Sequence, residues 1–329
     1  MVGEKFRAPE VVIAGELNMD LIFYGLPETL EPEREHLAEK MAFTLGSSSA
    51  IFAHNLAVLG SRVGFISRIG QDRMGQAARE WLNESGVDTS RVRCLPAPAR
   101  SGLTVILTRQ RDRLILTYPG TIFELSYDDL DFDYLLSARH FHLASFFLQR
   151  ALRPRMLELF RRLKEAGLTI SLDTNDDPED AWDGNLSSLL EFVDILLVNE
   201  REAKRLTGTE EVSEAAERLA KRAALVVVKL GSQGALARRG SKQWQVPGLK
   251  VSVVDAVGAG DSFDAGFIYQ YLRGADVEKS LRFGNLAGAL SVTRAGGTEA
   301  FRDRAHLRKF MEEHWPAPAA EAESGIRYD

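Results

Sequence analysis

The segment Asp255–Ile268 (DAVGAGDSFDAGFI) places three small residues directly before an acidic one. Aromatic residues then recur at four-residue spacing, which predicts a helix that begins near the glycines. The first N–H groups of a helix have no partner within it, and the helix dipole adds about half a positive charge there. Gly258, Ala259 and Gly260 would let a phosphate approach these N–H groups. Asp261, in the first turn, would stay ionised and could accept a proton from an attacking hydroxyl.

This turn also has a simpler interpretation. A glycine-rich connection between a strand and a helix, with an aspartate as the helix cap, needs no ligand at all. The chain has no G-x-x-x-x-G-K-[ST] loop, and the turn is not a G-x-G-x-x-G turn. The motif alone therefore leaves both interpretations open.

Further polar residues follow predicted strands. Asn199 and Glu202 lie where a strand ends and a helix starts, and Asp173 and Asn175 end another strand. Ligand sites of open α/β sheets lie at the carboxyl ends of their strands, so these side chains are candidates for substrate or phosphate contacts. Glu202 could equally be an acid that complements a helix dipole.

Short apolar segments alternate with helical patterns along most of the chain. This alternation predicts a doubly wound α/β fold with a mostly parallel central sheet flanked by helices. The expected strands are 11–15, 63–67, 140–144, 168–173, 193–198 and 225–230, with a strand end at 251–254. The expected helices are 49–59, 74–85, 151–166, 200–206 and 213–222, and the chain beyond residue 290 is expected to be helical through 310.

Two segments depart from this alternation. Residues 102–118 (GLTVILTRQRDRLILTY) predict a β-hairpin whose charged turn, 109–113, is solvated, and residues 17–24 precede a polar stretch that contains proline. We expect one domain over residues 1–315, with a small β-sheet lid formed by about 16–40 and 98–122. Residues 316–329 (PAPAAEAESGIRYD) predict a flexible tail.

Composition excludes several classes of protein. The net charge is −6, from 41 Lys and Arg against 47 Asp and Glu, and no long basic tract occurs, which argues against nucleic acid as a partner. Cys94 is the only cysteine, so no intramolecular disulfide is expected. There is no apolar segment of 18 residues and no signal-like N-terminus, so we expect a cytoplasmic protein without membrane contacts.

With these residues in place, the chain resembles the ribokinase/PfkB family of carbohydrate kinases over about residues 10–312. Asp255–Asp261 (DAVGAGD) is similar to the family's DTxGAGD signature. Further similar motifs follow in the family's order: 15–20 (GELNMD), 45–50 (LGSSSA), 55–60 (NLAVLG), 68–75 (RIGQDRMG), 199–202 (NERE), 229–234 (KLGSQG) and 283–293 around Asn285.

The resemblance implies an ATP-dependent phosphotransferase acting on a hydroxyl of a sugar or sugar-like molecule, with ATP and Mg²⁺ as cofactors. Asp261 would be the general base, and the lid would exclude water. The implied substrate-binding residues are Asn18, Asp20, Gly46, Ser47 and Ser48, and the implied ATP-binding residues are Asn199, Lys229, Gly231, Gly234 and Asn285. Glu202 would position Mg²⁺ through water, and Asp255 with backbone carbonyls would offer a site for K⁺. The lid edge suggests a homodimer.

The chain departs from the family pattern in the sugar pocket and in the signature. Ser47 replaces the second glycine of a GG pair, and Ile51 replaces an asparagine, which would remove one hydrogen-bond partner of a sugar hydroxyl. Ala256 and Val257 replace hydroxyl residues of the signature.

Three alternatives remain open. The chain could be a nucleoside kinase, for which an aromatic pocket near Phe23, Phe52 or Phe123 would be evidence. It could be a nucleotide-binding regulatory pseudokinase, although the acidic residues at 202 and 261 are intact. It could also be a purely structural domain, but such a domain would not explain why the motifs occur in the family's order.

Overall fold

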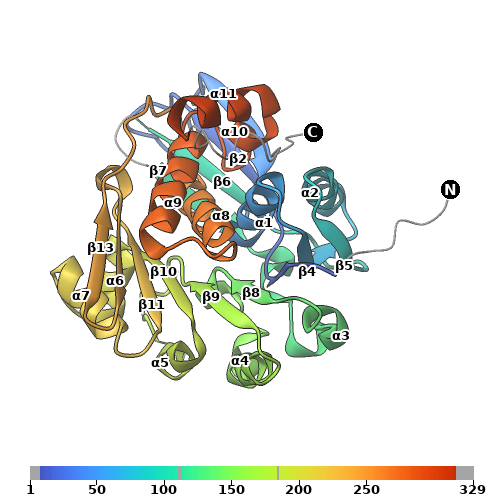
Figure 1. Ribbon diagram of the computed structural model, residues 1–329. Helices are drawn as coiled ribbons and strands as arrows, with labels where there is room; N and C mark the ends of the chain where they lie inside the picture. Colours follow the sequence, from blue (N-terminus) through green and yellow to red (C-terminus); the bar gives the residue numbers. More distant parts are fainter. Residues whose placement is uncertain (1–7, 110–112, 184, 316–329) are drawn as a thin grey trace.

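The computed structural model describes residues 8–109, 113–183 and 185–315 (Figure 1). Its centre is a nine-stranded sheet in the order β13-β12-β11-β10-β9-β8-β1-β4-β5. Neighbouring strands from β5 to β11 are parallel, whereas β12 and β13 form an antiparallel hairpin at one edge. The strands are β1 (Val11–Ala14), β4 (Val63–Gly70), β5 (Asp88–Leu95), β8 (His140–Leu143), β9 (Thr169–Asp173), β10 (Ile195–Asn199), β11 (Leu225–Lys229), β12 (Ala235–Arg239) and β13 (Lys242–Val246).

Alternate residues of each parallel strand pack into separate cores on the two faces of the sheet. In β10, Leu196 and Val198 join one core, while Ile195 and Leu197 join the other. The first face is covered by α3 (Phe132–Leu135), α4 (Met156–Glu165), α5 (Leu186–Leu189), α6 (Glu200–Thr207) and α7 (Val212–Leu219). The second is covered by α1 (Ser48–Val58), α2 (Arg73–Glu84), α8 (Ala259–Tyr271) and α9 (Val277–Ser291). This three-layer arrangement confirms the predicted doubly wound α/β fold.

A second, four-stranded sheet forms the lid, in the order β3-β2-β6-β7. Its strands are β2 (Met19–Tyr24), β3 (Lys40–Leu45), β6 (Leu103–Thr108) and β7 (Arg113–Tyr118). It is antiparallel except for the pair β2–β6. β3 begins at Lys40, the last residue of the segment 16–40 that the sequence suggested for the lid, and extends five residues beyond it.

Alternation along β2 gives the lid two different faces. Ile22 is buried against Val257 of the main domain, and Asp20 and Tyr24 lie on the same inner face. Leu21 and Phe23 therefore lie on the outer face. The register of the four strands extends this division across the whole lid.

Some sequence expectations were wrong in detail. Residues 251–254 form no strand, and 292–298 interrupt the helical stretch between α9 and α10 (Glu299–Arg302), which α11 (Arg304–His314) follows. Strands β3, β5, β12 and β13 were not predicted. Residues 110–112 of the charged turn and the predicted tail lie outside the described residues. No helix in the part of the chain that the structure describes has the length and apolar character to cross a bilayer.

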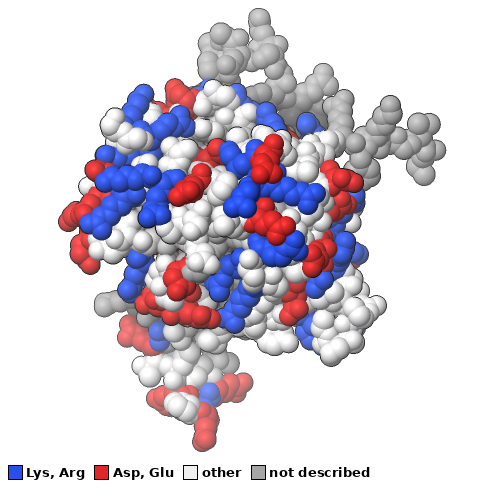
Figure 2. All heavy atoms as spheres, turned by 90° about the horizontal axis from the view of Figure 1, so that it is seen from below, with Lys and Arg blue, Asp and Glu red and all other residues white. Residues whose placement is uncertain are grey.

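Figure 2 shows the molecule from below the view of Figure 1. On this face, basic and acidic side chains are interspersed, and neither sign forms a large continuous patch.

Candidate active site

The predicted polar residues meet at one edge of the central sheet because parallel strands end together. Asn199 and Lys229, the last residues of β10 and β11, are paired in register. Asp173, the last residue of β9, is paired with Leu197 of β10. Three strands therefore bring an amide, an ammonium and a carboxylate side by side at their carboxyl ends.

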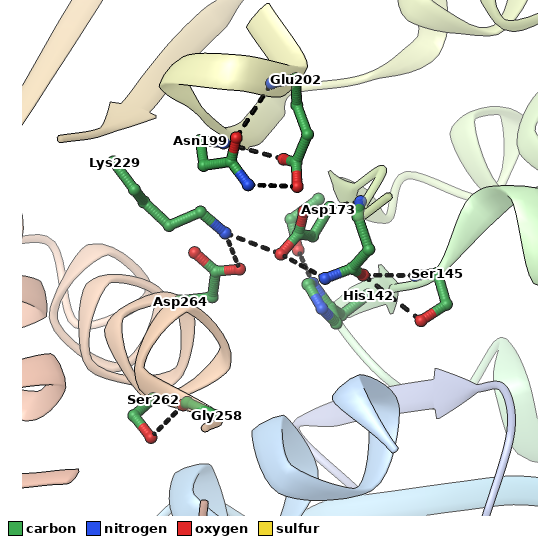
Figure 3. A network of polar contacts seen from close by, with 11 residues as sticks. His142, Ser145, Asp173, Asn199, Glu202, Lys229, Gly258, Ser262 and Asp264 are labelled. Atoms are coloured by element: carbon green, nitrogen blue, oxygen red, sulfur yellow. Dashed lines mark hydrogen bonds and ion pairs between the residues drawn. The ribbon is translucent and has the colours of Figure 1, made fainter. Parts of the chain in front are cut away.

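Lys229 lies between two buried aspartates (Figure 3). Its Nζ donates to Asp173 Oδ2 at 2.7 Å and to Asp264 Oδ2 at 2.9 Å. Burial alone would lower the pKa of Lys229, but the two carboxylates outweigh it and raise the pKa, so the ammonium stays charged. Burial is also the largest influence on Asp264 and raises the pKa of this carboxyl well above its usual value. Among the described residues, Asp264 Oδ1 is buried without a hydrogen-bond partner.

Asn199 and Glu202 cap the N-terminus of α6 reciprocally. Glu202 N–H donates to Asn199 Oδ1 at 2.9 Å, and Asn199 N–H donates to Glu202 Oε2 at 2.8 Å. The side-chain amide of Asn199 also donates to Glu202. Burial, followed by the charge of Asp173, raises the pKa of Glu202 to about 7. The carboxyl of Glu202 is thus held in place at the start of α6.

The turn before α8 has the geometry of an anion-binding site. Gly258 has φ 71°, and a Cβ on it would lie 2.5 Å from the Cα of Gly297, so only glycine fits. The amide N–H groups of Gly258, Gly260 and Asp261 have no acceptor within the described part of the chain, and that of Ala259 has only a long bond of 3.4 Å. This turn, here called the cradle, therefore presents amides that are free to bind an anion.

The cradle lies close to the ammonium of Lys229. A Cβ on Gly260 would be 3.6 Å from Lys229 Nζ. An anion bound to these amides would therefore also lie near the positive charge of Lys229.

Asp261 lies in the first turn of α8 and is 8% exposed. Burial, followed by the charge of Asp173, raises the pKa of Asp261 to about 6, and a hydrogen bond with Ser48 opposes this shift. A carboxylate with this pKa is a stronger base than an exposed aspartate and is still mostly ionised at neutral pH.

Asp20 approaches the same site from the lid. Burial, followed by the charge of Asp261, raises the pKa of Asp20 to about 7, so the two carboxylates share one electrostatic environment. Asn18 Nδ2 donates to Asp20 Oδ1 at 3.3 Å and to Thr104 Oγ1 at 3.4 Å. Gly46 has no side chain because a Cβ would overlap the carboxylate of Asp20. The predicted substrate residues are thus assembled between lid and helix α8.

Ser47 shows how the chain accommodates the loss of the family's second glycine. Its φ is 67°, a conformation that normally favours glycine. Its hydroxyl donates to Glu16 O at 2.5 Å and accepts from Ala50 N–H at 3.1 Å, which caps α1. Buried Glu16 also accepts from Ser49 at 2.9 Å. These bonds hold the strained backbone in place.

Ile51, which replaces an asparagine of the family pattern, packs against two glycines. Ile51 is 2% exposed, and its side chain packs against Gly258 and Gly297, beneath the cradle. Asn55, one turn later, donates to Ser262 Oγ at 2.9 Å and to Gly297 O at 3.0 Å. Ile51 and Asn55 therefore support the turn before α8.

The nucleotide-side residues are placed around the hairpin after β11. Gly231 and Gly234 have φ 57° and 100°, and a Cβ on Gly234 would overlap the backbone at Val246–Gly248. Asn285 on α9 donates to Val246 O at 3.3 Å and to Pro247 O at 3.1 Å. Asn285 thus fastens the loop after β13, next to the hairpin.

Sequence reasoning missed Asp264, Asn55, Thr104 and Tyr24. Asp264 had a signal, since it follows Asp261 by three positions and lies near it on the helix. The other three make contacts between distant segments, which local spacing does not reveal.

The comparisons with known proteins identify the family of this chain. A model of the pfkB family carbohydrate kinases matches residues 8–304. An uncharacterized sugar kinase of Archaeoglobus fulgidus is 33% identical over 74% of this chain and 96% of its own length. The ATP-dependent ribose-1-phosphate kinase of Halopiger xanaduensis is 30% identical over 88% of this chain and 94% of its own.

A solved structure agrees as well. The putative ribokinase II of E. coli, in complex with ATP and Mg²⁺, superposes with a TM-score of 0.80 at 25% identity and covers 93% of this chain and 100% of its own. The predicted resemblance is confirmed by the family match, by the relatives and by the fold. The chain is a kinase that belongs to the pfkB family of carbohydrate kinases.

Proposed function

We propose that this protein transfers the γ-phosphoryl group of ATP to a hydroxyl of a sugar or sugar-like molecule, with Asp261 as the general base. The observation that carries the proposal is the position of Asp261. Its buried carboxyl lies in the first turn of α8, directly after a cradle of unbonded amides and electrostatically coupled to Asp20 of the lid. A hydroxyl between the two aspartates could lose its proton to Asp261 as its oxygen attacks phosphorus.

The phosphate end of the site uses fixed positive charge. The amides of Gly258, Ala259 and Gly260 would receive the oxygens of the transferring group, and Lys229 would meet the same group from the side. Donors that are already oriented stabilise the charge of a transition state without reorganisation. Gly231, Gly234 and the loop fastened by Asn285 would hold the rest of the nucleotide, next to Asn199.

Mg²⁺ fits this site through its charge. Burial, followed by the charge of Asp173, raises the pKa values of Glu202 and Asp261, and a dication nearby would favour the ionised form of both carboxyls. No group of three His, Cys, Asp or Glu side chains in the described ranges could hold a metal on its own. Mg²⁺ takes few protein ligands when it binds a nucleotide, so Glu202 and Asn199 would hold it through water. Bound there, it would offset the charge of the phosphates.

The acceptor would bind between the lid and helix α8. Asn18 and Asp20 offer a donor and an acceptor for its hydroxyl groups, and Gly46, Ser47 and Ser48 form the facing N-terminus of α1. The lid would cover the acceptor and exclude water, which suppresses hydrolysis of ATP.

The contacts of the aromatic residues do not favour a nucleoside as acceptor. Phe52 stacks on His142 in the core, with ring centroids 3.7 Å apart. Phe123 lies under the guanidinium of Arg150, and Phe23 lies on the outer face of the lid. No ring contact joins any two of these three among the described residues. The pocket that a base would need is not formed by them.

A screen of ADP formation tests the proposed function. We expect turnover with one or more neutral sugars, sugar acids or sugar phosphates, little with nucleosides, and slow hydrolysis without acceptor. The products should carry phosphate on a hydroxyl, as ³¹P NMR would show. Binding of ATP without turnover for any acceptor would instead identify a regulatory nucleotide-binding protein.

We also propose that the protein forms a homodimer through the outer face of the lid. This face presents Met41, Leu114, Leu116 and Tyr118, which are 61, 43, 58 and 57% exposed. β7 lies at the edge of the lid sheet, so its outer backbone groups are available for another chain. A second copy would cover both the apolar side chains and this edge.

Substituting Leu116 tests the dimer. We expect the wild-type protein to sediment as a dimer and Leu116→Glu to sediment as a monomer, since a charge would be buried at the interface. Leu157→Glu on α4, where the leucine is 37% exposed, is the matched control and should remain dimeric. A wild-type monomer at micromolar concentration would contradict the proposal.

A further inference from the structure

The last residue of lid strand β2 contacts the turn that carries the amide cradle. The hydroxyl of Tyr24 donates to Asp255 Oδ2 at 2.7 Å. These residues are 231 positions apart, and Asp255 precedes Gly258 by three. One hydrogen bond therefore joins the lid to the phosphate-binding turn.

Asp255 organises this turn with its remaining lone pairs. Its Oδ1 accepts from Val257 N–H at 3.0 Å, and its Oδ2 also accepts from Gly296 N–H at 2.9 Å. Gly296 is followed by Gly297, against which Gly258 packs. Through these three bonds, Asp255 fixes the lid, the signature turn and the 296–297 loop relative to one another.

An apolar contact accompanies the polar one. Ile22, Ile106 and Val257 are 0, 4 and 8% exposed and pack together. Ile22 and Ile106 are register partners on the inner face of the lid, and Val257 lies next to Gly258. The lid thus rests directly on the cradle, and opening it would break both contacts.

The surroundings of Asp255 do not fit a monovalent cation. A cation needs several oxygen atoms as ligands, but the groups that converge on this carboxylate are hydrogen-bond donors, two amides and one phenol. The neighbouring side chains, those of Ala256 and Val257, contain no oxygen. A cation at the carboxylate would have to displace these donors.

We propose that Tyr24 is a positioning residue that fastens the closed lid to the phosphate-binding turn, and that its hydroxyl takes the place beside Asp255 that a monovalent cation would occupy. This inference rests on the proposed function. If the protein transfers phosphate, the contact with Tyr24 means that the cradle is complete only when the lid covers the acceptor. Two results follow: turnover is independent of K⁺, and loss of the hydroxyl uncouples ATP hydrolysis from transfer.

The first test compares salts. At equal ionic strength, KCl and choline chloride should give the same kcat/KM and the same Tm for the wild-type protein. A ligand that binds only the folded state raises its stability, so a cation site would appear as a K⁺-specific increase of Tm even without activity. Such an increase, or a tenfold activation by K⁺, would overturn the proposal.

The second test removes the hydroxyl. A hydrogen bond to a charged group contributes about 1.5–3 kcal/mol, so Tyr24→Phe should lower kcat for transfer by about 10- to 100-fold and raise the ratio of hydrolysis to transfer. Tyr271→Phe is the matched control, since its hydroxyl is bonded to Arg239 at 2.8 Å, away from the site, and its kinetics should be unchanged.

Hydrogen exchange separates this inference from the function itself. In the substrate-free protein, the amide hydrogens of β2 and β6 should exchange faster in Tyr24→Phe than in the wild type or in Tyr271→Phe. The reason is that the lid of Tyr24→Phe opens more often. Unchanged exchange in Tyr24→Phe would refute the fastening role whatever the substrate is. A wild-type protein without transfer activity would refute the proposed function but leave this measurement informative.

Discussion

Asp261→Asn is expected to lower kcat by about 100- to 10,000-fold while leaving the fold intact. The amide keeps the shape of the carboxyl but cannot accept the proton of the attacking hydroxyl, and positioned general bases contribute rate factors of this size. Burial raises the pKa of the Asp261 carboxyl, which means that its negative charge is unfavourable in the folded protein. The substitution removes this charge, so the Tm should not fall. Single-turnover kinetics with saturating ATP and acceptor measure the chemical step directly.

The same carboxyl should set the pH dependence of the wild-type enzyme. The ionised form is the proposed base, so the rate should rise as pH increases through about 6 and then level off. kcat/KM reports the free enzyme, where Asp20 and Glu202 also ionise near pH 7, so its rise should be steeper and extend further. In Asp261→Asn, the component centred near pH 6 should disappear.

Asp133→Asn provides the matched control for these measurements. Asp133 is exposed in the first turn of α3, far along the chain from the signature, and its substitution should leave kcat and the pH profile unchanged. Near-normal turnover in Asp261→Asn would show that another group takes the proton.

Lys229→Met is the second substitution with a large expected effect, and it should affect both stability and catalysis. The ammonium is the partner of buried Asp173 and Asp264, and removal of one member of a buried ion pair costs about 3–5 kcal/mol. Removing one electrostatic group aimed at the transferring phosphoryl should lower kcat by about 100- to 1,000-fold. Urea unfolding and steady-state kinetics measure the two effects separately.

The pH dependence of the stability loss identifies its cause. The pKa of Asp264 is raised, so its carboxyl can take up a proton at pH 5 and lose its unpaired charge. The loss of unfolding free energy caused by Lys229→Met should therefore be smaller at pH 5 than at pH 8. Lys229→Met, Asp264→Asn is the compensating variant, because it removes the ammonium together with one of its two carboxylate partners. It should recover part of the lost stability but not kcat. Recovery of kcat as well would show that Lys229 acts only on the structure of the site.

Much of the site could be predicted because its residues follow local rules. Asp173, Asn199 and Lys229 end buried strands, and parallel strands bring their carboxyl ends to one edge. Asp261 begins a helix whose apolar spacing is clear from the sequence. In both cases the position of a side chain follows from the element that carries it.

The rest depends on contacts that no local pattern encodes. Ile51 occupies a position expected in the sugar pocket, yet its side chain fills the space left by Gly258 and Gly297. Tyr24 looks like an ordinary strand residue until its strand is paired with β3 and β6 and laid on the turn at Asp255. The strands of the hairpin β12–β13 were missed because their sequences, ALARR and KQWQV, contain few large apolar residues.

The two-sided lid also constrains how this protein can diverge. Asp20, Ile22 and Tyr24 alternate with Leu21 and Phe23, so inserting a single residue into β2 would turn the acidic side chain outward and an aromatic ring toward the substrate. Substitutions at every second position avoid this inversion. New acceptor preferences should therefore arise by exchanging side chains on the inner row, with the length of the strand preserved.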